Sequence, residues 1–102
     1  MIRAEFFESK GCLVGFSFSG HSGYAESGSD IVCAAVSSAV QLTANMLEEF
    51  GHSPELKVGG NVIECRVRPD DNASQMIKVL REHFESILEE FPKTIKITNS
   101  EV

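Results

Sequence analysis

Residues 20–40, GHSGYAESGSDIVCAAVSSAV, join a stretch rich in glycine and serine to an apolar segment with helical spacing. The glycine-rich part is too polar and too flexible for a regular element, which predicts a long loop over residues 20–29. Ser29 or Asp30 can accept hydrogen bonds from the free amides at the start of a helix, and Gly51 can end that helix. We therefore expect a loop that leads directly into a long helix.

Apolar residues with a period of two predict two strands before the loop. The first strand covers residues 2–7 and is followed by a turn at residues 9–11, and the second strand ends near residue 20. The residues of the second strand that we expect to face the core are Cys12, Val14, Phe16 and Phe18. The corresponding core face of the helix contains Val32, Val36, Ala39, Met46, Leu47 and Phe50.

The second half of the chain repeats this order of elements. Two short strands, over residues 55–58 and 62–67, flank a glycine-rich turn and predict a second hairpin. A second helix with one apolar stripe follows and ends at Pro92, and a last strand contains Ile95 and Ile97. The apolar stripe of that helix comprises Ile77, Leu80, Phe84, Ile87, Leu88 and Phe91. The sequence predicts one α+β domain over residues 1–102, in the order ββαββαβ, with two helices on one mixed sheet.

Composition narrows the class of function. The chain has 102 residues and a formal charge of −6, which repels phosphate backbones and argues against direct binding of nucleic acid. A basic partner or substrate would be attracted instead. The chain opens with no signal-like segment, and its three widely spaced cysteines fit neither a disulfide framework nor a CxxC motif. We therefore expect a cytoplasmic protein that does not enter a membrane.

Cys33 is the cysteine best placed for chemistry. It follows the glycine-rich loop and falls in the first turn of the expected helix, where free amides and the helix dipole favour a thiolate. The same amides could stabilise an oxyanion. Cys12 and Cys65 occupy apolar strand positions and are expected to be small buried side chains. The alternative for Cys33 is also a packed helical cysteine.

His21 stands at the other end of the loop and could form a Cys/His dyad with Cys33. A solvated loop histidine is the alternative interpretation. Asp30 could orient His21, although a role as the N-cap of the helix explains this residue as well. Ser37 lies one turn after Cys33 on the same face of the helix, where a packing role is as reasonable as a functional one.

Other ligand sites are not supported by the spacing. His52 and His83 have no cysteine or acidic partner at metal spacing, and a site made of Cys33, His21 and Asp30 would lack a fourth zinc ligand. The loop also lacks the lysine and the Ser/Thr of a phosphate-binding P-loop. No metal is expected.

The segments GHSGY at residues 20–24, Gly28, and DIVCAAVS at residues 30–37 resemble the signature of the bacterial ribosomal-processing cysteine proteases. The resemblance implies that His21 and Cys33 form the catalytic dyad and that no cofactor is required. The positions that it implies in support of the site are Gly20, Asp30 and Ser37, and Gly23 and Gly28 are compatible with a mobile loop that orders over a bound peptide.

The resemblance also implies a substrate and an assembly. The substrate is ribosomal protein twenty-seven of the large subunit, whose short N-terminal extension is removed before the ribosome assembles, and the assembly is a homodimer. A non-catalytic module for ribosome assembly or regulation, which binds a ribosomal partner through the glycine-rich loop, is the alternative. Only the coincidence of a thiol and a histidine across a flexible loop favours the enzyme.

Overall fold

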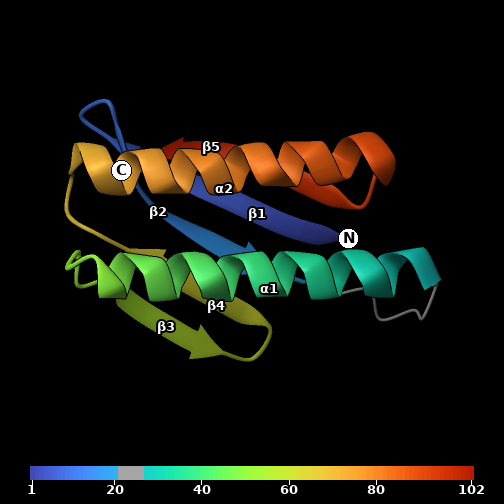
Figure 1. The fold of residues 1–102 in the computed structure, drawn as a ribbon. Coiled ribbons are helices and arrows are strands. Elements are labelled where there is room, and N and C mark those ends of the chain that lie inside the picture. The colour runs from blue at the N-terminus through green and yellow to red at the C-terminus, as the bar shows by residue number, and fades with distance from the viewer. Residues whose placement is uncertain (21–26) are drawn as a thin grey trace.

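Seven elements follow one another in the order ββαββαβ in the computed structural model (Figure 1), which describes residues 1–20 and 27–102 and the side chains of residues 1–20 and 31–102. The elements are β1 (Ile2–Ser9), β2 (Cys12–Ser19), α1 (Ser27–Glu49), β3 (Glu55–Gly59), β4 (Val62–Arg66), α2 (Asp71–Glu90) and β5 (Ile95–Glu101). The predicted α+β class and element order are confirmed.

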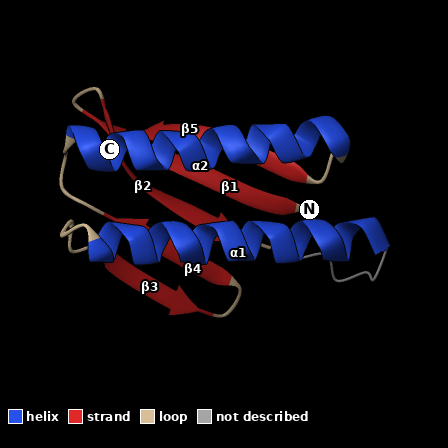
Figure 2. Ribbon diagram, in the orientation of Figure 1, coloured by secondary structure: helices blue, strands red, loops and turns tan. Residues whose placement is uncertain are grey.

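The strands form one mixed sheet with the order β3-β4-β2-β1-β5. The pair of β1 and β5 is parallel, and the other neighbouring strands are antiparallel. Both helices lie side by side on one face of the sheet (Figure 2), and the core fills the space between these two layers. The strand order, which the sequence does not predict, makes β3 and β5 the edges of the sheet.

A register shift between Phe7 and Glu8 changes which side of β2 faces the core. Phe16 and Phe18 belong to the core cluster as expected, but Leu13 belongs to it in place of Val14. A bulge adds one residue to a strand and so reverses the side on which the following residues lie. The expectation that Val14 faces the core with Phe16 is therefore wrong, and Val14 is buried outside the main cluster.

Helix α1 differs from its prediction at both ends. It begins at Ser27, so neither Ser29 nor Asp30 is its N-cap, and the last part of the expected loop is helical. At the other end Phe50 lies beyond the helix and is 64% exposed, so its expected place in the core is wrong. The amide of Gly51 donates to the carbonyl of Glu48, and Gly51 has a φ of 83°, which favours glycine at this helix end.

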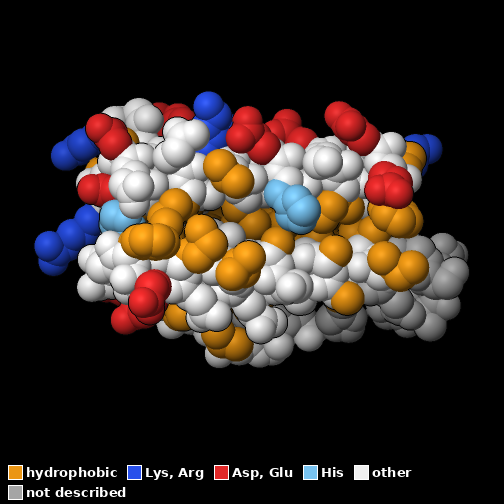
Figure 3. Space-filling model, in the orientation of Figure 1, with side chains coloured by type: hydrophobic (Ala, Val, Ile, Leu, Met, Phe, Trp, Pro, Cys, Tyr) orange, Lys and Arg blue, Asp and Glu red, His pale blue; other side chains and the backbone are white. Residues whose placement is uncertain are grey.

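The segment Ile31–Glu49 is long and apolar enough to cross a membrane by length and composition alone. In the fold, its most deeply buried residues pack onto the sheet; they are Val32, Val36, Val40 and Leu47. Figure 3 shows further hydrophobic side chains along the seam between α1 and α2. The exposed large hydrophobic residues of the two helices include Ile31, Leu42 and Val79. The buried stripe of α1 therefore serves the core of this domain.

Helix α2 completes the core through an aromatic cluster. Asp70 caps its N-terminus, because the Asp70 carboxylate accepts a hydrogen bond of 2.9 Å from the amide of Ala73. The ring of Phe84 lies 6.0 Å from that of Phe6, which in turn lies 6.5 Å from that of Phe16. These three rings join α2 to the middle of β1 and β2.

Candidate active site

Gly20 ends β2 in a conformation that only glycine adopts without strain. Its φ is 82°, and a Cβ at this position would lie 2.8 Å from the carbonyl oxygen of Met1. That backbone is anchored, because the amide of Ile2 donates to the carbonyl of Thr94 over 3.1 Å. Gly20 therefore fixes the direction in which the chain leaves the sheet immediately before His21.

His21 and Gly23 lie outside the described residues. Their placement relative to Cys33, and the mobility of the loop over residues 20–29, therefore stay predictions from the sequence. The described chain resumes at Ser27, where α1 begins. Gly28 and Asp30 both belong to the backbone of α1, and the supporting role predicted for Asp30 also stays a prediction.

Cys33 is not in the first turn of its helix. At a rise of about 1.5 Å per residue, it lies about 9 Å along α1 from Ser27. The free amides of a helix belong to its first four residues, and the effect of the helix dipole falls off within the first turn. The prediction that Cys33 lies in the first turn is therefore wrong, and the predicted effects of the helix terminus on its thiol and on an oxyanion lose the placement on which they depend.

The Cys33 side chain is half-buried and packs against the edge of the core cluster. It is therefore partly accessible and partly held in place. Ser37 follows one turn later and is also half-buried. At 100° per residue, Cys33, Ser37 and Ala44 share one flank of α1, and Ala44 on this flank lines a groove against β3. The structure thus places Cys33 and Ser37 together, on the side of α1 that faces the β3–β4 hairpin.

The other two cysteines have different surroundings. Cys65 is fully buried, and its burial raises the pKa of the thiol to about 11, which confirms its prediction as a small core residue. Cys12 is only half-buried, and its Sγ lies 3.9 Å from Oδ1 of Asp71. It is the first residue of β2 and pairs with Ser9, the last residue of β1, at the end of the hairpin. The expectation of full burial for Cys12 is wrong.

His52 has a structural role between the two helices. Its Nε2 is 2.8 Å from the side-chain oxygen of Asn72, and its Nδ1 is 3.6 Å from the carboxylate of Asp70. Cys33 and Glu49, the last residue of α1, are about 24 Å apart along the axis, so His52 lies far from the thiol. His83 is exposed on α2. That helix lies on the side of α1 away from the β3–β4 hairpin (Figure 1).

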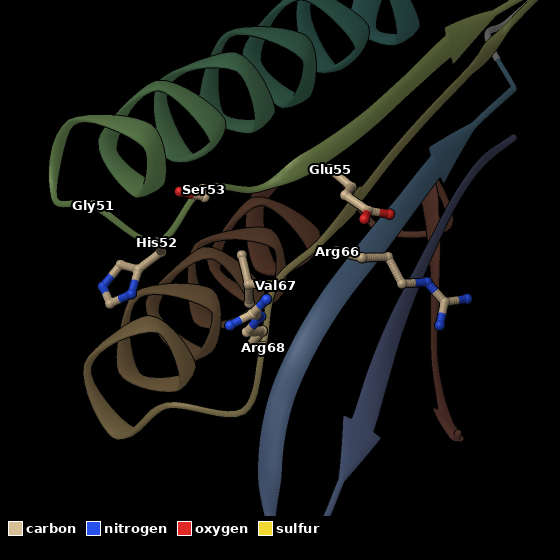
Figure 4. A pocket seen from close by; sticks show the side chains of 7 residues that line it. All are labelled: Gly51, His52, Ser53, Glu55, Arg66, Val67 and Arg68. Carbon is tan, nitrogen blue, oxygen red and sulfur yellow. The ribbon is translucent and has the colours of Figure 1, made fainter.

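A pocket of about 470 Å³ next to His52 does not form a second active site. Figure 4 shows that the ring of His52 and the guanidinium of Arg66 point away from each other. Arg66 instead lies over the ring of Phe7, at 4.0 Å from its centroid, and within 3.4 Å of Glu64. In residues 1–20 and 27–102, no three of the histidine, cysteine, aspartate and glutamate residues come together as a metal site.

Solved structures share this fold over the whole chain. The ribosomal processing protease Prp from S. aureus, in complex with a substrate peptide, has a TM-score of 0.88 and 21% identity, and the match covers 98% of this chain and 100% of that one. The same protease with a covalently linked product peptide has a TM-score of 0.85, 22% identity and the same coverage. SMU.848 from Streptococcus mutans has a TM-score of 0.81 and 25% identity, with 100% of this chain and 96% of that one covered.

Comparison with curated proteins finds no match. The model of one protein family, described as cysteine protease Prp, matches residues 1–96. These residues include every position that the sequence singles out as catalytic or supporting. Because the match spans nearly the whole chain, the protein belongs to the cysteine protease Prp family.

Proposed function

We propose that this protease removes the short N-terminal extension of ribosomal protein twenty-seven of the large subunit, with Cys33 as the nucleophile and His21 as the base. The observation that carries the proposal is the position of Cys33. Its side chain is half-buried in α1, the helix that follows the glycine-rich segment. Cys65 is fully buried and its thiol pKa is raised, and the Cys12 thiol donates to the carboxylate of Asp71 over 3.9 Å. Cys33 is therefore the best candidate among the three cysteines.

In this mechanism, His21 takes the proton of the Cys33 thiol as the sulfur attacks the scissile carbonyl. The C–N bond breaks, the amine leaves with the proton from His21, and an acyl-enzyme remains on Cys33. Water, deprotonated by His21, then releases the new carboxylate and restores the thiol. Because the helix terminus lies away from Cys33, the proposal assigns the activation of the thiol to His21 alone. Asp30 would orient His21, and Ser37 would shape the floor of the site.

The substrate follows from the family and from charge. The S. aureus protease of this fold was solved with a substrate peptide and with a covalently linked product peptide, which supports an acyl-transfer mechanism on a polypeptide. A formal charge of −6 favours the approach of a basic ribosomal protein. The proposal also includes a bacterial host, a cytoplasmic location and a homodimer, which rest on the resemblance of the sequence to the family.

The test is cleavage of the purified ribosomal protein with its native N-terminus, followed by mass spectrometry of the products. Wild type is expected to cut one bond and remove the extension, while Cys33→Ala and His21→Ala leave the substrate intact. Cys12→Ala serves as the matched control and should cleave normally. If wild type leaves the protein intact and Cys33→Ala binds it equally well, the non-catalytic binding module becomes the better account.

A further inference from the structure

The edge strand β3 has an unusual surface for the edge of a sheet. In the part of the chain that the structure describes, β3 pairs only with β4, and each of its five residues is exposed. Leu56 is 49% exposed and Val58 is 73% exposed. Because ladder hydrogen bonds alternate along a strand, every second residue of β3 directs its amide and carbonyl away from β4. An exposed edge with apolar side chains is a template for another strand.

A small apolar groove runs between this edge and α1. Its volume is about 150 Å³, and its apolar lining comes from Val40 and Ala44 on α1 and from Leu56, Val58 and Ile63 on the hairpin. Leu56 and Val58 pair with Cys65 and Ile63, so their side chains lie on the face of the sheet that carries the helices. A strand added to β3 would direct alternate side chains into this groove.

The groove borders the flank of α1 on which Cys33 lies nearer the N-terminus of the helix. Ala44 and Cys33 share this flank and are about 16 Å apart along the helix axis. An extended polypeptide rises about 3.3 Å per residue, so about five residues span this distance. A segment of about this length is therefore long enough to connect the groove at β3 with Cys33.

We propose that β3 and the groove beside α1 form a remote substrate-binding subsite, which binds an extended segment of the polypeptide substrate as an added strand. Alternate apolar side chains of that segment, about five residues from the scissile bond, occupy the groove next to Val58. The inference rests on the proposed role of Cys33 as nucleophile. It adds a specificity determinant that is separate from the dyad.

The polypeptide substrate is a better occupant of this edge than a second copy of the chain. The protein belongs to a protease family, so a polypeptide must bind along the surface that leads to its nucleophile. A stable protein interface buries about 1,200–2,000 Å² in total, whereas β3 has five residues and its groove accommodates only one or two side chains. A single extended peptide matches that size.

Binding is measured first, so that turnover does not limit the test. The probe is a fluorescent peptide with the N-terminal sequence of the ribosomal protein, which extends several residues beyond the scissile bond on both sides. Fluorescence anisotropy gives the Kd of this peptide for two proteins, the Cys33→Ala variant and the double variant that also carries Val58→Glu. Val58→Glu removes the apolar contact between Val58 and a peptide side chain in the groove, so it should raise the Kd of the peptide about tenfold. Val79→Glu, at another exposed valine, is the matched control and should leave Kd unchanged.

A second set of measurements separates the subsite from the chemistry. Val58→Thr, which keeps the shape and strand preference of valine, should give a smaller loss of the same kind. N-methylation of the peptide backbone in the remote segment should also weaken binding to Cys33→Ala, because it removes the strand hydrogen bonds and retains the side chains. In the wild-type background, Val58→Glu should raise KM for the long peptide with little change in kcat, and a short peptide around the scissile bond should be cleaved as before.

Equal binding of the long peptide by Cys33→Ala and by its Val58→Glu derivative would overturn the subsite. The absence of binding to Cys33→Ala would overturn it as well. A Val58→Glu variant that becomes monomeric in sedimentation velocity while peptide binding stays the same would identify a second copy as the occupant. Normal cleavage by Cys33→Ala would instead refute the proposed nucleophile, whatever Val58→Glu does.

Discussion

Gly20→Ala should damage both stability and activity. Alanine in the left-handed region costs about 1–2 kcal/mol, and the new Cβ, 2.8 Å from the carbonyl of Met1, adds a backbone displacement on the order of 1 kcal/mol. The sum of about 2–3 kcal/mol should lower the Tm by about 10–20 °C for a domain of this size. The displacement occurs directly before His21, so we expect a loss of kcat/KM of at least about tenfold.

Gly11→Ala is the matched control for this change. Gly11 has a nearly identical φ of 80°, but nothing lies within 4 Å of a Cβ built there. This variant should lose only about 1–2 kcal/mol and should keep wild-type activity below its melting range. Urea unfolding and peptide cleavage measure the two effects. If Gly20→Ala is no less stable than Gly11→Ala and cleaves peptide normally, the reasoning about the exit of β2 is wrong.

Three further predictions concern the scaffold. Phe84→Ala should cost about 3–5 kcal/mol in urea unfolding because it removes a ring from the aromatic cluster, whereas Phe50→Ala, at an exposed position, should stay within about 0.5 kcal/mol of wild type. Asp70→Ala should cost about 1 kcal/mol through the lost N-cap, and a neutral result would contradict the capping role of the carboxylate. The thiol pKa of Cys65 is raised from 9.0 to about 11 by burial, so the unfolded chain loses this proton first as the pH rises. The stability that the buried thiol contributes is complete below pH 9 and is lost by about pH 11, and the loss amounts to at most about 3 kcal/mol. The free energy of unfolding of Cys65→Ala should therefore decrease less than that of wild type over this pH interval.

The order of elements was predictable because local signals agree along most of the chain. Alternation in β1 and β2, the helical stripe of α2 and the turn at Gly11 all depend on neighbours in the sequence. The bulge that places Leu13 in the core depends on pairing between two strands, and the period of two in the sequence does not show it. The strand order likewise depends on contacts between distant segments, so the exposed edge at β3 could not be predicted.

The residues of the candidate site stay predictions from the sequence, and the local structure around them was predicted only in part. Gly20 was predicted from the motif, and its positive φ supplies the physical reason. The start of α1 was not, because residues 27–29 contain serine and glycine, which favour a loop on local propensity and are nevertheless helical here. That difference places Cys33 in the second turn of α1 and not in the first.

The central claim, that Cys33 is the nucleophile of a cysteine protease activated by His21, is tested most directly by covalent labelling. The wild-type protein, Cys33→Ala and His21→Ala are incubated with a peptidyl vinyl sulfone that carries the substrate sequence, and the adducts are mapped by mass spectrometry. We predict one rapid adduct on Cys33 in wild type, none in Cys33→Ala, which retains Cys12 and Cys65, and a much slower reaction in His21→Ala. An adduct on Cys12 at the wild-type rate in Cys33→Ala, or undiminished labelling in His21→Ala, would contradict the account.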